Sequence, residues 1–167
     1  GIGKSANIAT KIVSTFNSTG TPSIFMHAAD AIHGDLGIIQ EDDVIICISK
    51  SGNTPEIKVL IPLIKNLGNK LIAIVGDPKS SLGIQADYLL NVYVDREACP
   101  NNLAPTSSTT AQLVMGDALI VSLMEKRHFK ADDFALNHPG GALGKRLLVK
   151  VKEIMQTTIP YVYEKTP

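Results

Sequence analysis

The chain has 167 residues, of which 44% are hydrophobic and 19% charged, a composition that suits one folded domain with an apolar core. Its 16 Lys and Arg residues balance 16 Asp and Glu residues, so it has no basic excess of the kind that nucleic-acid-binding proteins normally show. Its apolar runs fall far short of the ~20 residues that a membrane span needs, and its two cysteines make no disulfide framework. We therefore expect a cytoplasmic protein that contacts neither nucleic acid nor membrane.

The first third of the chain alternates between helical and extended patterns. It opens with GIGKSA, which is typical of a loop that leads from a strand into a helix, so we expect a first strand upstream of residue 1. Apolar spacing predicts a helix over 5–19, a short strand over 22–26 and a short helix over 30–39. VIICIS at 44–49 is a β-branched run of the kind that forms strands buried on both faces.

The rest of the chain continues the alternation. Thr54 and Pro55 predict a helix start, with the threonine hydroxyl as N-cap, and the helix runs to Gly68. Strands are predicted over 70–75 and 88–94, and helices over 80–86, 108–127 and 140–155. The pattern indicates an α/β fold, a three-layer sandwich with about five parallel strands if the missing strand is counted. We expect one domain over 1–155 and a C-terminal tail over 156–167.

GIGKSA also resembles two glycine-rich nucleotide-binding motifs. A dinucleotide site needs an acidic residue at the end of the second strand, but His27 stands there and Asp30 follows three residues later. A P-loop would be tested by positions that precede Gly1, and no strand ends in the aspartate that a Mg²⁺ site would use. The sequence therefore disfavours both nucleotide hypotheses.

A second motif, SKSGNT at 49–54, follows the buried strand and enters the next helix. Ser49, Ser51 and Thr54 offer three hydroxyls beside a flexible glycine, Gly52, and beside free amides at a helix N-terminus. These groups can bind the phosphate of a small metabolite. The alternative is that the hydroxyls only cap the helix and shape a turn.

Further motifs lie in order along nearly the whole chain. Together with SKSGNT they resemble the sugar isomerase (SIS) domain family, and within it the arabinose-5-phosphate isomerases: GKS at 3–5, GTPS at 20–23, HGDLG at 33–37, EACP at 97–100, LAPTSSTT at 103–110, MGDAL at 115–119 and HPGGALG at 138–144. The resemblance implies a Rossmann-like SIS fold. It also implies interconversion of D-arabinose 5-phosphate and D-ribulose 5-phosphate, which feeds synthesis of the octulosonic acid Kdo for lipopolysaccharide or capsule.

The resemblance also assigns site residues. The implied catalytic side chains are Lys4, Glu56, Glu97 and His138. The implied substrate-binding residues are Ser5, Gly20, Thr21, His33, Ser49, Ser51, Gly52, Thr54, Thr106, Ser107 and Ser108. His27 is associated with a bound metal in this family, and since enediol chemistry needs no metal, we expect no required cofactor and treat zinc at His27 as inhibitory.

Aldose–ketose exchange moves a proton between C1 and C2, for which carboxylates and imidazole are the usual carriers. Glu97 follows a predicted strand and is the leading base, with a solvated loop glutamate as the alternative. Glu56 lies in the first turn of a helix, where it also complements the helix dipole. His138 suits ring opening or proton shuttling, and Lys4 suits stabilisation of the phosphate or the enediolate, although such a lysine often only faces solvent.

Departures from the family pattern occur at three places. Ala6 stands where relatives have glycine, Lys50 and Asn53 change the SNSGE pattern, and residues 27–30 read HAAD in place of HPGE. Most relatives continue into a pair of CBS regulatory modules, so we expect a short form or a trimmed chain. The resemblance implies a homotetramer, and we expect His33 to reach a sugar bound by another subunit. The alternative function is a non-catalytic sugar-phosphate sensor.

Overall fold

The computed structural model describes residues 1–141, 144–146 and 149–158. None of the helices in these ranges combines the length and the apolar character that a bilayer crossing requires. The elements follow one another as α1 (Lys4–Ser18), α2 (Ala28–Ala31), the 3₁₀ helix η1 (Asp35–Ile38), β1 (Val44–Ser49), α3 (Pro55–Leu67), β2 (Lys70–Val75), α4 (Ser81–Gln85), β3 (Tyr88–Asn91), α5 (Ser107–Lys126), α6 (Ala131–Asn137) and α8 (Val151–Ile154).

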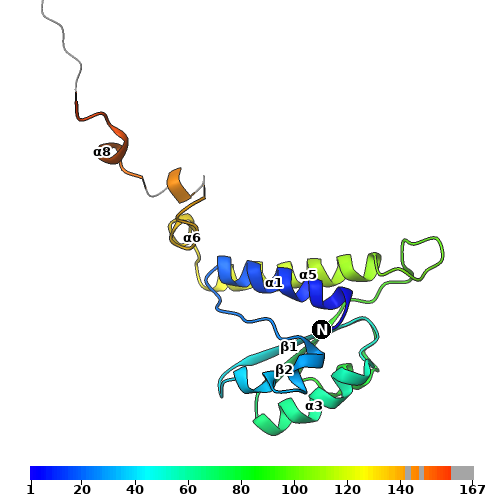
Figure 1. Cartoon of the computed structure of the whole chain (residues 1–167). Helices are drawn as coiled ribbons and strands as arrows, with labels where there is room; N and C mark the ends of the chain where they lie inside the picture. The colour runs from blue at the N-terminus through cyan, green and yellow to red at the C-terminus, as the bar shows by residue number, and fades with distance from the viewer. Residues whose placement is uncertain (142–143, 147–148, 159–167) are drawn as a thin grey trace, which may run out of the picture.

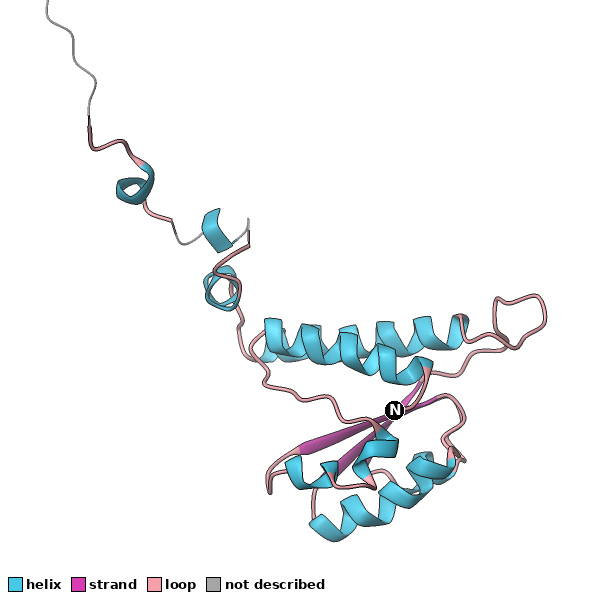
Figure 2. Ribbon diagram, viewed as in Figure 1, coloured by secondary structure: helices cyan, strands magenta, loops and turns pink. Residues whose placement is uncertain are grey.

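The strands form a parallel sheet in the order β1-β2-β3. Its register aligns Ser49 with Val75 and Val75 with Asn91, so the three carboxyl ends lie level at one edge. Helices α1 and α5 lie side by side over one face of the sheet, and α3 covers the other face together with α2 and α4 (Figure 1). The α/β sandwich with helices on both faces is confirmed (Figure 2).

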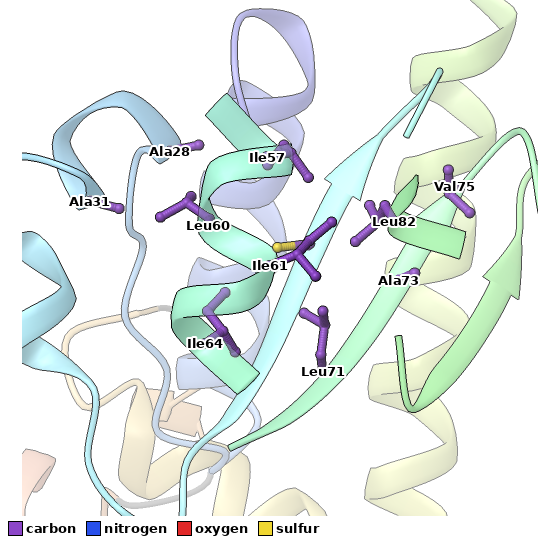
Figure 3. Packing of buried hydrophobic residues seen from close by; sticks show 11 residues of the cluster. Ala28, Ala31, Ile57, Leu60, Ile61, Ile64, Leu71, Ala73, Val75 and Leu82 are labelled. Atoms are coloured by element: carbon purple, nitrogen blue, oxygen red, sulfur yellow. The ribbon is translucent and has the colours of Figure 1, made fainter. Parts of the chain in front are cut away.

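Each face of the sheet has its own apolar core. On β2, Leu71, Ala73 and Val75 pack toward α3, whereas Ile74 packs toward α1 and α5. Figure 3 shows the α3 side, where the buried cluster consists of Ala28, Ala31, Cys47, Ile57, Leu60, Ile61, Ile64, Leu71, Ala73, Val75 and Leu82. The continuous apolar runs of β1 and β2 are therefore explained by burial on both faces.

The described part of the chain contains three strands of this sheet, so the expectation of about five was wrong. Residues 22–26 form no strand, and within them the side-chain amide of Asn17 pairs with both backbone groups of Ser23: its Nδ2 donates to the Ser23 carbonyl over 3.0 Å and its Oδ1 accepts from the Ser23 N–H over 2.7 Å. Strand β3 ends at Asn91 and not at residue 94, because the Asn91 side chain accepts from the Tyr93 N–H.

Two helix predictions also need correction. The helix expected over 30–39 is divided into α2 and η1 at Gly34, whose φ is +132°. The continuous helix expected over 140–155 is not formed: residues 144–146 are helical, but residues 149 and 150 are not, and the separate helix α8 begins at Val151. Residues 142–143 and 147–148 of that expected helix lie outside the described residues, as does 159–167 of the predicted tail. The domain boundary at residue 155 stays a prediction.

The α3 side of the core provides a stability test. Ile61 is fully buried, and Ile61→Ala should lower the free energy of unfolding by about 2–5 kcal/mol through lost burial and an unfilled cavity. Val59 on the same helix is 50% exposed, so Val59→Ala should change it by only about 0.5 kcal/mol. Urea unfolding followed by circular dichroism measures both. Equal losses in the free energy of unfolding for the two variants would contradict the burial of Ile61 and the exposure of Val59 on α3.

Candidate active site

A pocket of about 300 Å³ lies at the carboxyl end of β1, between the first turns of α1 and α3. We call it the loop pocket. It is lined by Ile2 and Ser5 from the start of the chain and by Ile48, Ser49, Lys50, Ser51 and Thr54 from the end of β1 and the loop after it. The carboxyl edge of a parallel sheet is where ligands bind in open α/β folds.

Internal hydrogen bonds hold the SKSGNT loop in shape. The Ser49 hydroxyl accepts from the Gly52 N–H and lies 3.1 Å from the Thr54 hydroxyl. Gly52 has a φ of +64°, and a Cβ there would lie 2.0 Å from the Ser80 hydroxyl, so no other residue fits this turn without a shift. The conformation of the loop, and with it the position of its hydroxyls, is therefore fixed before any ligand binds.

Helix α3 begins at this loop without a side-chain cap. The predicted cap by the Thr54 hydroxyl is wrong, because that hydroxyl pairs with Ser49 instead. Pro55 has no N–H, and within the described residues the N–H groups of Glu56 and Ile57 have no acceptor. Uncapped N–H groups and the helix dipole together attract an anion to this end of α3.

Helix α1 begins at the same pocket and is also uncapped. Its N-cap residue is Gly3, with a φ of +57° and no side chain to accept a hydrogen bond. Ser5, in the first turn, lines the loop pocket, and its hydroxyl donates to Oε1 of Gln112 over 3.1 Å. Two open helix N-termini thus converge on one small cavity, which is the arrangement expected of a phosphate site.

Helix α5 begins at the same edge, but the protein caps it with its own carboxylate. Glu97 is buried, and its Oε2 accepts from the backbone N–H groups of Thr106 (2.7 Å) and Ser108 (3.2 Å), while its Oε1 accepts from the Ser108 hydroxyl (2.5 Å). The predicted substrate-binding residues Thr106 and Ser108 therefore serve Glu97 in this structure.

Lys50 completes the environment of Glu97. Its ammonium Nζ lies 2.7 Å from Glu97 Oε1, and its side chain is 51% exposed at the rim of the loop pocket. Burial alone would raise the pKa of Glu97, but the hydrogen bonds from Lys50, Ser108 and Thr106 outweigh it and hold that pKa far below its ordinary value. Such a carboxylate is a weak proton acceptor at neutral pH, so the geometry favours a structural role for Glu97 over that of leading base.

Two other predicted catalytic residues lie beside the loop pocket. Lys4 is the exposed first residue of α1 and precedes Ser5. Glu56 is half-buried in the first turn of α3, two residues after Thr54. Both therefore lie within two positions of a residue that lines the cavity, one on each of the two open helices.

The remaining predicted residues are not brought to this pocket. Gly20 and Thr21 follow the far end of α1, about 22 Å along a helix of 15 residues, where Arg127 Nη1 donates to the Gly20 carbonyl and the Thr21 hydroxyl. His138 follows α6, which Asn137 attaches to Ser18 at that same end (Figure 1). Its Nδ1 lies 2.9 Å from the Phe134 carbonyl, and its ring stacks on Phe134.

His27 and His33 also lie outside the loop pocket. His33 is exposed after α2, and His27, the N-cap residue of α2, has its Nδ1 3.8 Å from Asp30 Oδ2. Within the described ranges, no three side chains of His, Cys, Asp or Glu gather as a metal site would require. Inhibitory zinc at His27 stays a prediction.

A larger, mostly apolar groove of about 720 Å³ runs along α5 beside β3. We call it the α5 groove, and its lining consists of Asn91, Val92, Tyr93, Ala98, Thr106, Ser107, Thr110, Ala111, Val114, Met115 and Ala118. Ser107, a predicted substrate-binding residue, belongs to this groove and not to the loop pocket. Val114 and Tyr93 are 62% and 67% exposed, so the groove presents apolar surface to solvent.

Three residues of the site network were missed at the sequence level. Lys50 was noted only as a change in the SNSGE pattern, but it pairs with Glu97. Asn102 accepts from the Glu97 N–H through its Oδ1, and Gln112 accepts from the Ser5 hydroxyl. The sequence offered one usable signal, a glutamine on the face of α5 that otherwise carries small and apolar residues. Its partner lies 107 residues away, so only the packing of α1 on α5 identifies it.

A parallel α/β sandwich with two open helix N-termini at one loop has the architecture of a domain suited to a small anionic ligand. Residues 1–122 match the SIS domain, and the chain belongs to the SIS-domain family.

Relatives of this chain carry more specific names. Arabinose 5-phosphate isomerase KdsD of Escherichia coli K12 is 57% identical over 164 residues, which cover 97% of this chain and 50% of that protein. The protein of the same name from Pseudomonas aeruginosa is 56% identical and is covered to 48%. A solved structure from E. coli CFT073 in complex with arabinose 5-phosphate is 47% identical, with a TM-score of 0.79 over 82% of this chain and 73% of that chain. The chain spans about half the length of the curated relatives it matches.

The capping role of Glu97 predicts a pH-dependent stability. Glu97→Gln should lower the free energy of unfolding by about 1–3 kcal/mol at pH 7, because an amide cannot accept all the hydrogen bonds that the carboxylate accepts. Since the folded-state pKa is lowered, this contribution is complete above the unfolded value of about 4.5 and is lost as the pH falls toward the folded-state pKa.

Thermal unfolding is measured from pH 7 to pH 3. The difference in unfolding temperature between the wild type and Glu97→Gln should therefore become smaller below about pH 4.5. Glu125, exposed on the same helix, is the control, and Glu125→Gln should follow the wild type throughout. A constant gap between wild type and Glu97→Gln over the whole range would contradict the ionised cap.

Proposed function

We propose that this chain is the isomerase domain of an enzyme that interconverts D-arabinose 5-phosphate and D-ribulose 5-phosphate. The observation that carries the proposal is the loop pocket, where two uncapped helix N-termini meet four hydroxyls. Its support in the comparisons is 57% identity to an arabinose 5-phosphate isomerase and 47% identity to a structure in complex with arabinose 5-phosphate. A cytoplasmic enzyme that supplies Kdo synthesis for lipopolysaccharide or capsule is the corresponding cellular role.

The proposed chemistry passes through an enediol. Glu56, at the open end of α3, takes the proton from one carbon and returns it to the other, a task for which carboxylates are usual carriers. Lys4, at the open end of α1, stabilises the enediolate or the phosphate. Glu97 keeps the N-terminus of α5 and Lys50 in place. In this proposal the reaction uses no cofactor, and zinc acts only as an inhibitor.

The site is proposed to be completed by a second copy of the chain. His138 lies at the opposite end of α1 from the loop pocket of its own chain, so it reaches a substrate only if it contributes to a neighbour's pocket. His33, exposed after α2, is a second candidate for such a contribution. The α5 groove, with exposed Val114 and Tyr93, is apolar surface that a symmetric homo-oligomer, in our proposal a tetramer, would bury.

The activity is tested by incubating the protein with arabinose 5-phosphate and measuring ribulose 5-phosphate, with ribose 5-phosphate and glucose 6-phosphate as controls. Glu56→Gln should lower turnover by ~10²–10⁴-fold, because it removes the proton acceptor, while the protein still binds inorganic phosphate. Glu125→Gln, on the exposed face of α5, should keep normal turnover. Phosphate binding without any isomerisation by the wild type would favour the sugar-phosphate sensor instead.

Shared sites are tested by mixing two inactive variants. His138→Ala and Glu56→Gln, each inactive alone, should regain part of the activity when they co-assemble, because some pockets then combine an intact Glu56 with an intact His138 from the neighbour. Each variant mixed with itself is the control, and subunit exchange is checked by native mass spectrometry. Complete exchange without recovery would mean that His138 acts in its own chain or not at all.

A further inference from the structure

One buried polar side chain of α5, Gln112, has no part in the chemistry described above. It is fully buried, on the face of α5 that also carries Ser108, Gly116 and Ile120. Its Oε1 accepts from the Ser5 hydroxyl over 3.1 Å, whereas its Nε2 has no hydrogen-bond partner in the described part of the chain. A buried amide with unpaired N–H groups is costly, so this side chain calls for an explanation.

The observed orientation also restricts Ser5. A hydroxyl has a single proton to donate, and the Ser5 proton is directed at Gln112. Ser5 lines the loop pocket, and a phosphate oxygen there is a pure acceptor that needs a donated proton. In this orientation the hydroxyl can offer such a ligand only its lone pairs.

Rotating the Gln112 side-chain amide by half a turn changes both the unpaired Nε2 and the direction of the Ser5 proton. It exchanges Nε2 and Oε1, and Nε2 then lies where Oε1 was, 3.1 Å from the Ser5 hydroxyl oxygen, and donates to it. The Ser5 proton is released toward the pocket. The carbonyl oxygen then has no partner, which proteins tolerate more often than an unpaired N–H, and one of the two N–H groups of Nε2 gains an acceptor. The released proton in turn needs an acceptor, which a bound phosphate supplies.

We propose that Gln112 is a positioning residue that couples Ser5 to the phosphate of the ligand through this amide rotation. When a phosphate monoester enters the loop pocket, Gln112 Nε2 donates to Ser5 Oγ, and Ser5 Oγ donates to a phosphate oxygen. The anion thus closes a hydrogen-bond chain that runs from the buried face of α5 to the first turn of α1. The inference rests on the proposed function only for the presence of a phosphate group.

The primary test uses the unmodified sequence. In deuterated, ¹⁵N-labelled protein, the side-chain NH₂ signals of Gln112 should shift on titration with inorganic phosphate, in parallel with the backbone signals of the loop at Gly52, because Nε2 gains a partner. A shift of the Gly52 signals with no change at Gln112 would overturn the proposal. The titration does not depend on isomerisation, so a chain that binds phosphate without turnover would contradict the proposed function and leave this test intact.

A double-mutant cycle provides the second test. Ser5→Ala should weaken phosphate binding by about tenfold, as expected for a lost hydrogen bond to a charged group. Gln112→Met keeps the length and apolar packing of the side chain, and it should weaken binding by about threefold to tenfold by leaving Ser5 without a donor behind it. Since both changes break one chain, the double variant should bind no more weakly than Ser5→Ala alone.

A purely structural role for Gln112 gives a different pattern. If Gln112→Met only loosens the packing of α1 on α5, its effect on the dissociation constant would multiply with that of Ser5→Ala, and this result would overturn the proposal. Gln112→Glu is the second variant: a carboxylate keeps the Ser5 proton directed inward, so phosphate binding should weaken at least as much as in Gln112→Met. Normal phosphate affinity in Gln112→Glu would equally overturn it.

Discussion

The site depends on one geometric constraint, which is that parallel βα units bring helix N-termini to the edge where the strands end. The register that levels Ser49, Val75 and Asn91 places the loops after β1 and β3 at the same edge. Helices α3 and α5 follow these loops, and α1 begins at the same pocket, so three helices each bring to this edge N–H groups that their own helix cannot satisfy. How these three ends are satisfied decides what the domain can bind.

The N-termini of α1, α3 and α5 differ in whether a side chain caps them. The N-terminus of α5 is closed by the buried carboxylate of Glu97, whose charge Lys50 balances. The ends of α1 and α3 carry no side-chain cap and face the loop pocket. Among the described residues, the lining of the loop pocket thus combines open helix N-termini with hydroxyls and Lys50, and it contains no arginine. A pocket with few fixed charges suits a small ligand that must dissociate again after it binds.

The same helices also separate residues that motif matching would group together. Lys4 and Ser5 lie at the open end of α1, whereas Gly20, Thr21 and His138 lie at its other end. One chain therefore presents two clusters of motif residues, and the exposed apolar surface of the α5 groove offers a way for copies to bring them together. This separation is the physical basis of the proposed shared site.

The sequence by itself determined the layers and the ligand loop. VIICIS and KLIAIV are apolar enough to be buried on both faces, Pro55 and Gly68 mark the ends of α3, and SKSGNT at the end of β1 indicated an anion site, because each of these signals is local. Tertiary structure alone decided that Glu97 caps α5 with Lys50 beside it, and that Gln112 meets Ser5. The last pair is 107 residues apart, so its contact exists only once α1 packs on α5, and no local pattern contains that information.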